Sequence, residues 1–305
     1  MNTSSDKQFE LASDSPRTWI GIVLLFLAAL GFTINILIAN MAFRDGFDVN
    51  TTNAVRYFVT IVLLFIFEKI RGKQLKLPQR ERYTALALGI SVFMMGVGYL
   101  GATQYIPVSL AVLLFYTAPF FVAVVAKFTE NEAITIIRLI AIIIAFIGLV
   151  LALEIQSVAT IDWRGVAFGF MAALGCATLV NVSSLTMRTA DPQAVNIHCL
   201  AAGSVLFVIF LIFSGGPTAS ITQPGWIKLG VASLALAIAY GSFFAGLEII
   251  GTVKTAMLMN MEPILTIILA AIFLDERLSS IQLVGAGFVI VGIILITGGF
   301  RKVNN

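Results

Sequence analysis

The feature that most constrains this chain is an internal repeat with an offset of 144 residues. The segments Trp19–Gly31 and Trp163–Gly175 are identical at seven of thirteen positions in that register. Two unrelated apolar helices would match by chance at roughly one or two of these positions, because their alphabet is narrow. The alternative is that the similarity arises by chance from the shared apolar composition of the two helices. A gapless register that continues to about Gly292 favours duplication of one structural unit.

The same offset relates two hydrophobic segments that each carry a proline in mid-span. Leu113–Glu132 aligns with Met257–Glu276, so that Pro119 corresponds to Pro263 (263 − 119 = 144). A proline inside a helix removes one backbone hydrogen bond, and within lipid the freed carbonyl needs a protein or water partner. Paired interruptions at corresponding positions are the best indication of a transport site in such repeats. We therefore expect both prolines to act as hinges or to line a cavity; a packing kink without ligand contact is the alternative.

Composition and hydrophobic runs predict an all-α membrane protein. Hydrophobic residues make up 59% of the 305 and charged residues only 11%, against about 25% in soluble proteins. Ten runs of about 20 residues are long enough to span a bilayer. The predicted spans are Trp19–Phe43, Asn53–Phe67, Tyr83–Gln104, Val108–Phe128, Ile134–Leu153, Trp163–Met187, Ala194–Phe213, Trp226–Ile249, Gly251–Leu274 and Ile281–Gly299.

Five spans fall in each copy of the repeat. An odd number makes the second copy enter the membrane from the opposite side, so the sequence predicts two inverted five-helix repeats. The predicted organisation is a tail (1–18), a first repeat (19–153), a linker (154–162), a second repeat (163–299) and a second tail (300–305).

The distribution of Lys and Arg predicts the orientation. With the N-terminus inside, fourteen of the nineteen fall in inner segments, four in outer segments, and Arg56 within a span. Positive charge concentrates on the cytoplasmic side of membrane proteins, so both termini are predicted to be cytoplasmic. The four outer residues are Arg44, Arg164, Lys228 and Arg277.

These features together resemble a known family. A proline in mid-helix at Glu262-Pro263, an apolar run to Glu276, and then Gln282 and Gly285 are similar to the EamA-like permeases of the drug/metabolite transporter superfamily. The resemblance covers nearly the whole chain. It implies a secondary carrier of small metabolites, often an exporter, that works by alternating access in the plasma membrane, which is the inner membrane in bacteria. The first half departs from the pattern, because Ala118 replaces the glutamate before the proline.

Glu262 is the most informative single residue. It lies about eleven residues into its predicted helix, or ~16 Å at 1.5 Å per residue, which is near the middle of the membrane. An ionisable group at that depth is costly and usually faces a cavity or a partner. The position suits a group that binds and releases a proton in each transport cycle. The alternative is a permanently protonated carboxyl that hydrogen-bonds the carbonyls freed by Pro263.

Several other polar side chains are predicted to lie within the membrane. Buried amides and phenols need partners there, so each is expected either to contact substrate or to join helices. The candidates are Asn260, Tyr116, Asn35, Asn181, Tyr99 and Tyr240.

Arg56 lies about one turn inside its span. It is a candidate to hold an anionic substrate or to pair with Asp45 or Asp48, and snorkelling to the outer surface is the alternative. Glu132 and Glu276 precede the next helices in the two halves, where a carboxylate can cap a helix N-terminus, so we interpret both as structural.

Other classes of function are disfavoured. The sequence has no H-E-x-x-H pair, no nucleophile elbow and no phosphate-binding loop, so neither an enzyme nor direct use of ATP is expected. Cys176 and Cys199 both lie in apolar spans and predict neither a disulfide nor a metal site. We expect no cofactor and no nucleic-acid partner; the expected partners are a small organic solute, lipid and protons. An uncoupled facilitator or a channel stays open as an alternative, although inverted repeats favour a carrier.

Overall fold

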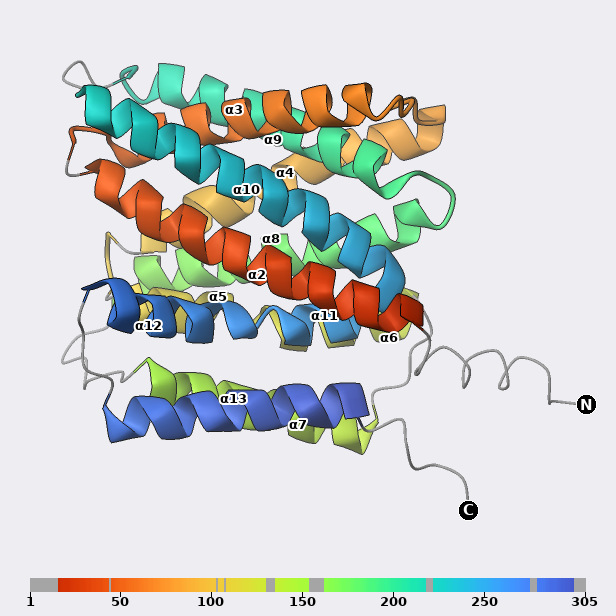
Figure 1. Cartoon of the computed structure of the whole chain (residues 1–305), viewed down its shortest axis with the longest axis vertical. Helices are drawn as coiled ribbons and strands as arrows, with labels where there is room; N and C mark the ends of the chain where they lie inside the picture. Colours follow the sequence, from red (N-terminus) through yellow and green to blue (C-terminus); the bar gives the residue numbers. More distant parts are fainter. Residues whose placement is uncertain are drawn as a thin grey trace, which may run out of the picture.

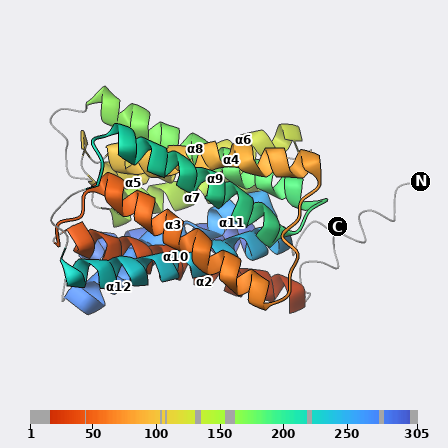
Figure 2. The same ribbon diagram turned by 90° about the horizontal axis from the view of Figure 1, so that it is seen from above.

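The computed structural model describes residues 16–43, 45–102, 104–106, 108–129, 135–153, 162–217, 222–274 and 279–298. These residues form helices whose axes are roughly parallel or antiparallel to one another (Figures 1 and 2). The helices of the first half are α2 (Pro16–Phe43), α3 (Val49–Ile70), α4 (Gln79–Ala102), α5 (Val108–Phe115), α6 (Ala118–Thr129) and α7 (Ile136–Ala152). Those of the second half are α8 (Trp163–Met187), α9 (Pro192–Phe213), α10 (Gln223–Ile250), α11 (Thr252–Leu258), α12 (Met261–Leu274) and α13 (Ser280–Gly298).

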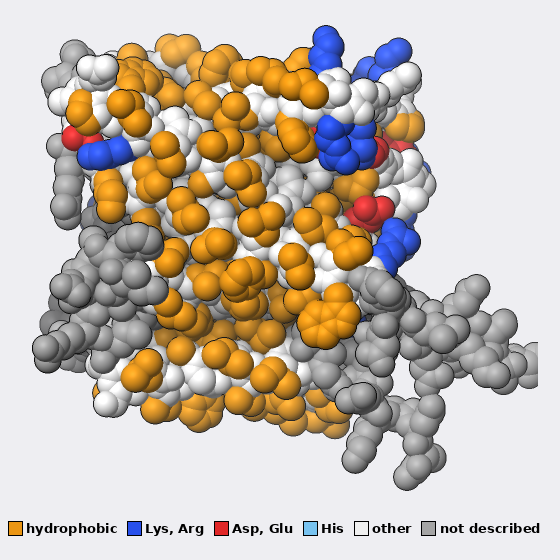
Figure 3. Space-filling view, viewed as in Figure 1, with side chains coloured by type: hydrophobic (Ala, Val, Ile, Leu, Met, Phe, Trp, Pro, Cys, Tyr) orange, Lys and Arg blue, Asp and Glu red, His pale blue; other side chains and the backbone are white. Residues whose placement is uncertain are grey.

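The predicted all-α membrane class is confirmed. Six stretches of the described chain are long and apolar enough to cross a membrane, and two shorter apolar helices accompany them. Large apolar side chains cover the visible face of the bundle (Figure 3). Many large apolar side chains of the described residues are exposed, including Trp163, Phe213 and Ile212. Apolar atoms exposed on this scale need lipid rather than water around them.

Two of the predicted spans are interrupted. The span predicted at Val108–Phe128 consists of α5 and α6, and the span predicted at Gly251–Leu274 consists of α11 and α12. In Figure 1 these broken helices lie between the pair α7–α13 and the remaining helices. Contacts of α6 with α8, of α12 with α2 and of α11 with α13 fix them there.

The principal helix pairs each join the first half of the chain to the second. α2 packs along α10, α4 along α8, α3 along α9, and α7 along α13. In the first two pairs a glycine allows the close approach. A β-carbon on Gly31 would lie 2.9 Å from the carbonyl oxygen of Ala235, and one on Gly175 would lie 2.9 Å from that of Ser91. The two contacts are equivalent under the offset of 144 residues. Gly31 corresponds to Gly175 (31 + 144 = 175) and Ser91 to Ala235 (91 + 144 = 235), so the two halves exchange their roles.

The pair α7–α13 shows the same exchange. A β-carbon on Gly148 would lie 2.7 Å from the carbonyl oxygen of Gly285, and one on Gly292 would lie 2.8 Å from that of Ala141. These two contacts are also equivalent, since Gly148 corresponds to Gly292 (148 + 144 = 292) and Ala141 to Gly285 (141 + 144 = 285). Small residues let helix backbones approach in membranes, where no hydrophobic force drives helices together.

Positive charge gathers at one end of the bundle. Figure 3 shows most of the visible Lys and Arg side chains at the end where α2 begins. This basic end includes the turn after α3, with Arg71 and Lys73. At the opposite end Lys228 pairs with Asp45 at 2.6 Å.

The second helix is longer than the span predicted for it. α3 begins at Val49 rather than Asn53, because Asp48 caps it by accepting hydrogen bonds from the backbone N–H groups of Asn50 and Thr51. Hydropathy missed this first turn, since its polar side chains interrupt the apolar run.

Candidate functional site

The two helix interruptions lie just before the prolines rather than at them. α6 begins at Ala118 with Pro119 as its second residue, and α12 begins at Met261 with Pro263 as its third. The prediction that each proline removes a bond from the middle of a helix is therefore wrong. A proline in the first helical turn loses little, because its N–H would have no partner inside the helix.

The breaks themselves are single tight turns. The N–H of Thr117 donates to the carbonyl of Leu114 at 3.1 Å, and the N–H of Glu262 donates to that of Met259 at 3.0 Å. Each turn separates two half-helices within one span. The second half-helix then presents its N-terminus, the positive end of its dipole, to the interior of the bundle.

The two breaks meet through a side-chain contact. The hydroxyl of Tyr116, in the turn after α5, hydrogen-bonds the carboxylate of Glu262, in the first turn of α12. Tyr116 is buried, whereas Glu262 is half-buried and keeps part of its surface accessible. The predicted candidates Glu262 and Tyr116 thus lie together, although 146 residues separate them in the chain.

Other helices complete the surroundings of Glu262. The hydroxyl of Thr33 on α2 donates to the backbone carbonyl of Glu262 at 3.2 Å, and Thr266 donates to the same carbonyl at 3.0 Å. Tyr99 on α4 and Cys176 on α8 are near enough to interact electrostatically with the carboxylate. We call Glu262, Tyr116, Tyr99, Thr33 and Cys176 the central cluster. Its members come from α2, α4, α8, α12 and the turn between α5 and α6.

Asn260 lies in the second break, at the position that corresponds to Tyr116. Its side chain is 2% exposed, and its Nδ2 makes only a long contact of 4.0 Å with the sulfur of Met257. No described residue hydrogen-bonds its Oδ1. A buried amide oxygen without a donor is available to a ligand or a water.

A second polar cluster surrounds Arg56. Its Nη2 donates to Asn53 Oδ1 at 2.7 Å and its Nη1 donates to Asn35 Oδ1 at 3.2 Å. Its Nε has no partner among the described residues. Tyr57 follows in the same helix, and its hydroxyl lies 3.3 Å from that of Tyr240 on α10.

The expectations of snorkelling and of an aspartate partner for Arg56 are both wrong. The side chain is 9% exposed and points inward to the two amides. Asp45 is instead the partner of Lys228, and Asp48 caps α3. The positions of Asn53, Arg56 and Tyr57, three and four residues apart, put them on one helix face, and that spacing could have revealed the cluster.

Asn181 joins helices rather than either cluster. Its Nδ2 donates to the carbonyl of Ala177 in its own helix α8 at 2.9 Å and reaches that of Val122 on α6 at 3.5 Å. The predicted capping residues Glu132 and Glu276 lie outside the described residues. Thr33 and Cys176 were not predicted as site residues, because a single hydroxyl or thiol in an apolar helix gives no pattern to read.

Comparison with known proteins agrees with this architecture. The family model of the EamA-like transporter family matches residues 19–153 and again residues 163–298. The chain belongs to the EamA-like transporter family. The predicted resemblance is thereby confirmed, and so is the prediction that the chain is a transporter rather than an enzyme.

Individual relatives are distant but cover almost the whole chain. The threonine/homoserine exporter RhtA of Escherichia coli (strain K12) is 26% identical over 277 residues, which cover 89% of each chain. The uncharacterized transporter YoaV of Bacillus subtilis (strain 168) is 25% identical over 260 residues, covering 82% of this chain and 87% of the relative. A solved crystal structure has the same fold, with a TM-score of 0.80 over 93% of this chain at 16% identity.

Proposed function

We propose that the protein is a secondary-active carrier that exports a small organic metabolite across the bacterial inner membrane by alternating access. Membership of a transporter family supplies the general activity. The observation that carries the proposal further is the contact of Tyr116 with Glu262, because it joins two broken helices at an ionisable group inside the bundle. Broken helices that meet in mid-membrane are typical of substrate and ion sites in carriers.

The exchanged glycine contacts support a pair of inverted five-helix repeats. If α5 with α6, and α11 with α12, each count as one span, each half has five spans. A two-fold axis between the repeats predicts that each contact between the halves has an equivalent contact, 144 residues away in both partners, in which the halves are reversed. Positive charge at the end where α2 begins favours a cytoplasmic position for that end.

Glu262 is the group that we assign to proton coupling. It is half-buried among helices from both halves, and only one hydroxyl hydrogen-bonds its carboxylate among the described side chains. A carboxylate that stays partly accessible inside a membrane protein can exchange a proton with water. The amide of Asn260 and the phenol of Tyr99 offer hydrogen-bonding groups to a polar solute near the same break.

The solute class is proposed from chemistry and from a relative. Amides, phenols and aromatic rings suit an amphipathic solute such as an amino acid or its derivative. RhtA is named as an exporter of threonine and homoserine, so these two amino acids are the first probes.

The test uses purified protein in proteoliposomes loaded with labelled threonine or homoserine. We expect saturable efflux that accelerates when an inward proton gradient is imposed. If neither probe is moved, a thermal-shift screen against metabolite pools identifies another, because a ligand that binds only the native state at 100 times its Kd stabilises it by about 2.7 kcal/mol. Saturable flux that ignores the proton gradient would identify an uncoupled facilitator instead. Flux that does not saturate would identify a channel.

A further inference from the structure

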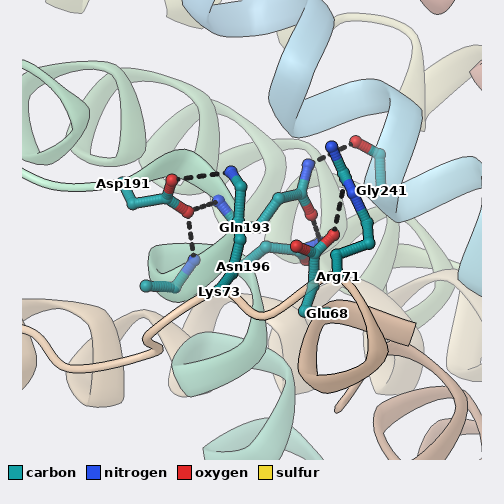
Figure 4. Close-up of polar contacts among 8 residues, drawn as sticks. Glu68, Arg71, Lys73, Asp191, Gln193, Asn196 and Gly241 are labelled. Atoms are coloured by element: carbon teal, nitrogen blue, oxygen red, sulfur yellow. Dashed lines mark hydrogen bonds and ion pairs between the residues drawn. The ribbon is translucent and has the colours of Figure 1, made fainter. Parts of the chain in front are cut away.

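The basic end of the bundle holds a buried carboxyl that the proposed transport cycle does not use. Glu68 lies near the end of α3 and is 2% exposed. Its Oε1 accepts a hydrogen bond from Arg71 Nη1 at 3.2 Å (Figure 4). No described residue donates to its other oxygen, Oε2.

A chain of amides beside it ends in a second acceptor without a donor. The carbonyl of Gly241 can only accept, so Gln193 must turn its Nε2 toward it, at 2.8 Å. Gln193 therefore presents Oε1 to Asn196, which must donate its Nδ2, at 3.2 Å. This order fixes the remaining Asn196 atom as Oδ1. Asn196 is fully buried, and its Oδ1 has no partner among the described residues.

The register of α3 against α9 places these two acceptors opposite one another. Lys73, just after α3, pairs at 2.8 Å with Asp191, just before α9, so the two helices are antiparallel. The ring of Tyr57 stacks on that of Phe207 at 4.7 Å. Glu68 is eleven residues further along α3 (68 − 57 = 11), on the same helix face after about three turns.

Asn196 is likewise eleven residues back along α9 (207 − 196 = 11). Figure 4 shows the side chains of Glu68 and Asn196 beside each other, in agreement with this register. Two facing acceptors leave two buried polar atoms unsatisfied, and each such atom is costly. One proton on Oε2 of Glu68, donated to Oδ1 of Asn196, satisfies both.

We propose that Glu68 is a proton-binding site whose protonated form hydrogen-bonds Asn196 and holds α3 against α9 at the basic end. The proton comes from the solution on that side, and its release leaves an ionised carboxylate facing an amide oxygen, which favours separation of the two helices. A metal cation fits less well, because Arg71 already occupies one carboxylate oxygen and only two oxygens remain. The proposal does not depend on which solute is carried.

Several charged or titratable groups lie near this site in the described chain. The thiol of Cys199 on α9 donates to the backbone carbonyl of Asn196 at 3.1 Å. Arg71 contacts Glu68 directly, His198 lies on α9 and hydrogen-bonds the carbonyl of Ala194, and Glu248 lies on α10. The ion pair of Lys73 and Asp191 lies at the same end. Burial by itself raises the pKa of Asp191, and the hydrogen bonds from Lys73 and from the backbone outweigh it, so that the pKa is lowered overall. Asp191 therefore stays ionised and does not compete for the proton.

The test is infrared difference spectroscopy of the full-length protein in lipid during a pH titration. We expect a band from a protonated carboxyl that is present in the wild type, absent in Glu68→Gln and retained in Glu81→Gln. Glu81 is a matched control at the same end, where it accepts a hydrogen bond from Thr189. Removal of the acceptor in Asn196→Ala should move the band to higher frequency, because the carboxyl loses its hydrogen-bond partner.

Thermal unfolding provides a second readout that does not require transport. The amide of Glu68→Gln can donate to Asn196 as the protonated acid does, so its melting temperature should match that of the wild type at low pH and change less as pH rises. Glu68→Ala should melt lower by roughly 3–6 °C. The proposal is overturned if wild type and Glu68→Gln give the same carboxyl spectrum at every pH, or if Glu68→Gln loses as much stability as Glu68→Ala.

Discussion

The two helix breaks are built alike and carry different chemistry. In the first, Tyr116 precedes α6, whose first residue is Ala118; in the second, Asn260 precedes α12, which carries Glu262 at the equivalent position. Both breaks are one tight turn followed by a proline in the first helical turn. The backbone of the repeat has been kept while its polar side chains have diverged.

The two breaks share their backbone structure, but only the second carries a carboxylate. Two equivalent glutamates facing each other in the membrane would repel, since like charges disfavour ionisation of both. In the first break Tyr116 instead provides one hydroxyl for the single carboxylate of the second. Under the proposed proton coupling, this asymmetry puts the proton-binding group in one half and its hydrogen-bonding partner in the other.

The largest expected effect comes from removing that carboxylate. Glu262→Gln should keep expression and fold but lose pH-dependent transport, on the order of 100-fold, the scale for loss of a proton-transferring group. The measurement is efflux of threonine from proteoliposomes with and without a proton gradient. Adding Ala118→Glu to this variant should not restore transport, because the first break lacks the partner that Tyr116 gives to Glu262. Full transport with unchanged pH dependence in Glu262→Gln would end the assignment of Glu262.

A smaller effect is expected from the other side of the same contact. Tyr116→Phe removes the hydroxyl that hydrogen-bonds Glu262 but keeps the ring, so coupling should weaken by about tenfold, or ~1.4 kcal/mol, typical of one lost hydrogen bond to a charged group. Tyr99→Phe is the matched control, because Tyr99 interacts with Glu262 only through space. The comparison requires a change in the pH profile of Tyr116→Phe that Tyr99→Phe does not show.

Much of this architecture was predictable from the sequence. The offset of 144 residues located the breaks to within three residues, and hydropathy found the apolar helices. The exact break positions were missed, because a proline can either interrupt a helix or begin one, and only the preceding turn distinguishes these cases.

The sequence could not group the polar candidates. From the sequence alone, Tyr116, Tyr240 and Asn181 had the same two possible roles, contact with substrate or a join between helices. In the structure they belong to the central cluster, to the cluster around Arg56 and to a helix contact, respectively. Which residues meet depends on helix packing across the two halves, and composition or periodicity does not encode it. The inward position of Arg56 depended in the same way on amides from two different helices.

The equivalent glycine contacts between α7 and α13 allow the two halves to be compared by their effect on stability. Gly148→Leu and Gly292→Leu should each destabilise the protein by about 1–3 kcal/mol, because each overpacks the same interface between α7 and α13. Gly287→Leu is the control on α13, since a β-carbon at that position meets nothing within 4 Å. Thermal unfolding in detergent measures all three. Clearly unequal losses of stability in Gly148→Leu and Gly292→Leu would show that the two glycine contacts are not equivalent.

The smallest effect is expected at the basic end. Lys73 lowers the pKa of Asp191, so the pair contributes stability that is present above the unfolded pKa of about 3.9 and is lost as pH falls through the lowered folded value. Both side chains are partly exposed, so solvent screening limits the contribution to a few tenths of a kcal/mol. Lys73→Met should therefore lower the free energy of unfolding by this amount at neutral pH and leave it unchanged in strong acid. Equal losses at both pH values would show that the pair does not act through charge.

The central claim is that the two halves insert in opposite directions, so that their breaks meet at Glu262. Single cysteines at Lys73 and Pro217, which correspond under the offset (73 + 144 = 217), test it directly when the native cysteines are replaced. A membrane-impermeant thiol reagent applied to intact cells should label Pro217→Cys, and it should label Lys73→Cys only after the membrane is opened. Labelling of both positions from the same side would contradict the inverted arrangement and the carrier mechanism built on it.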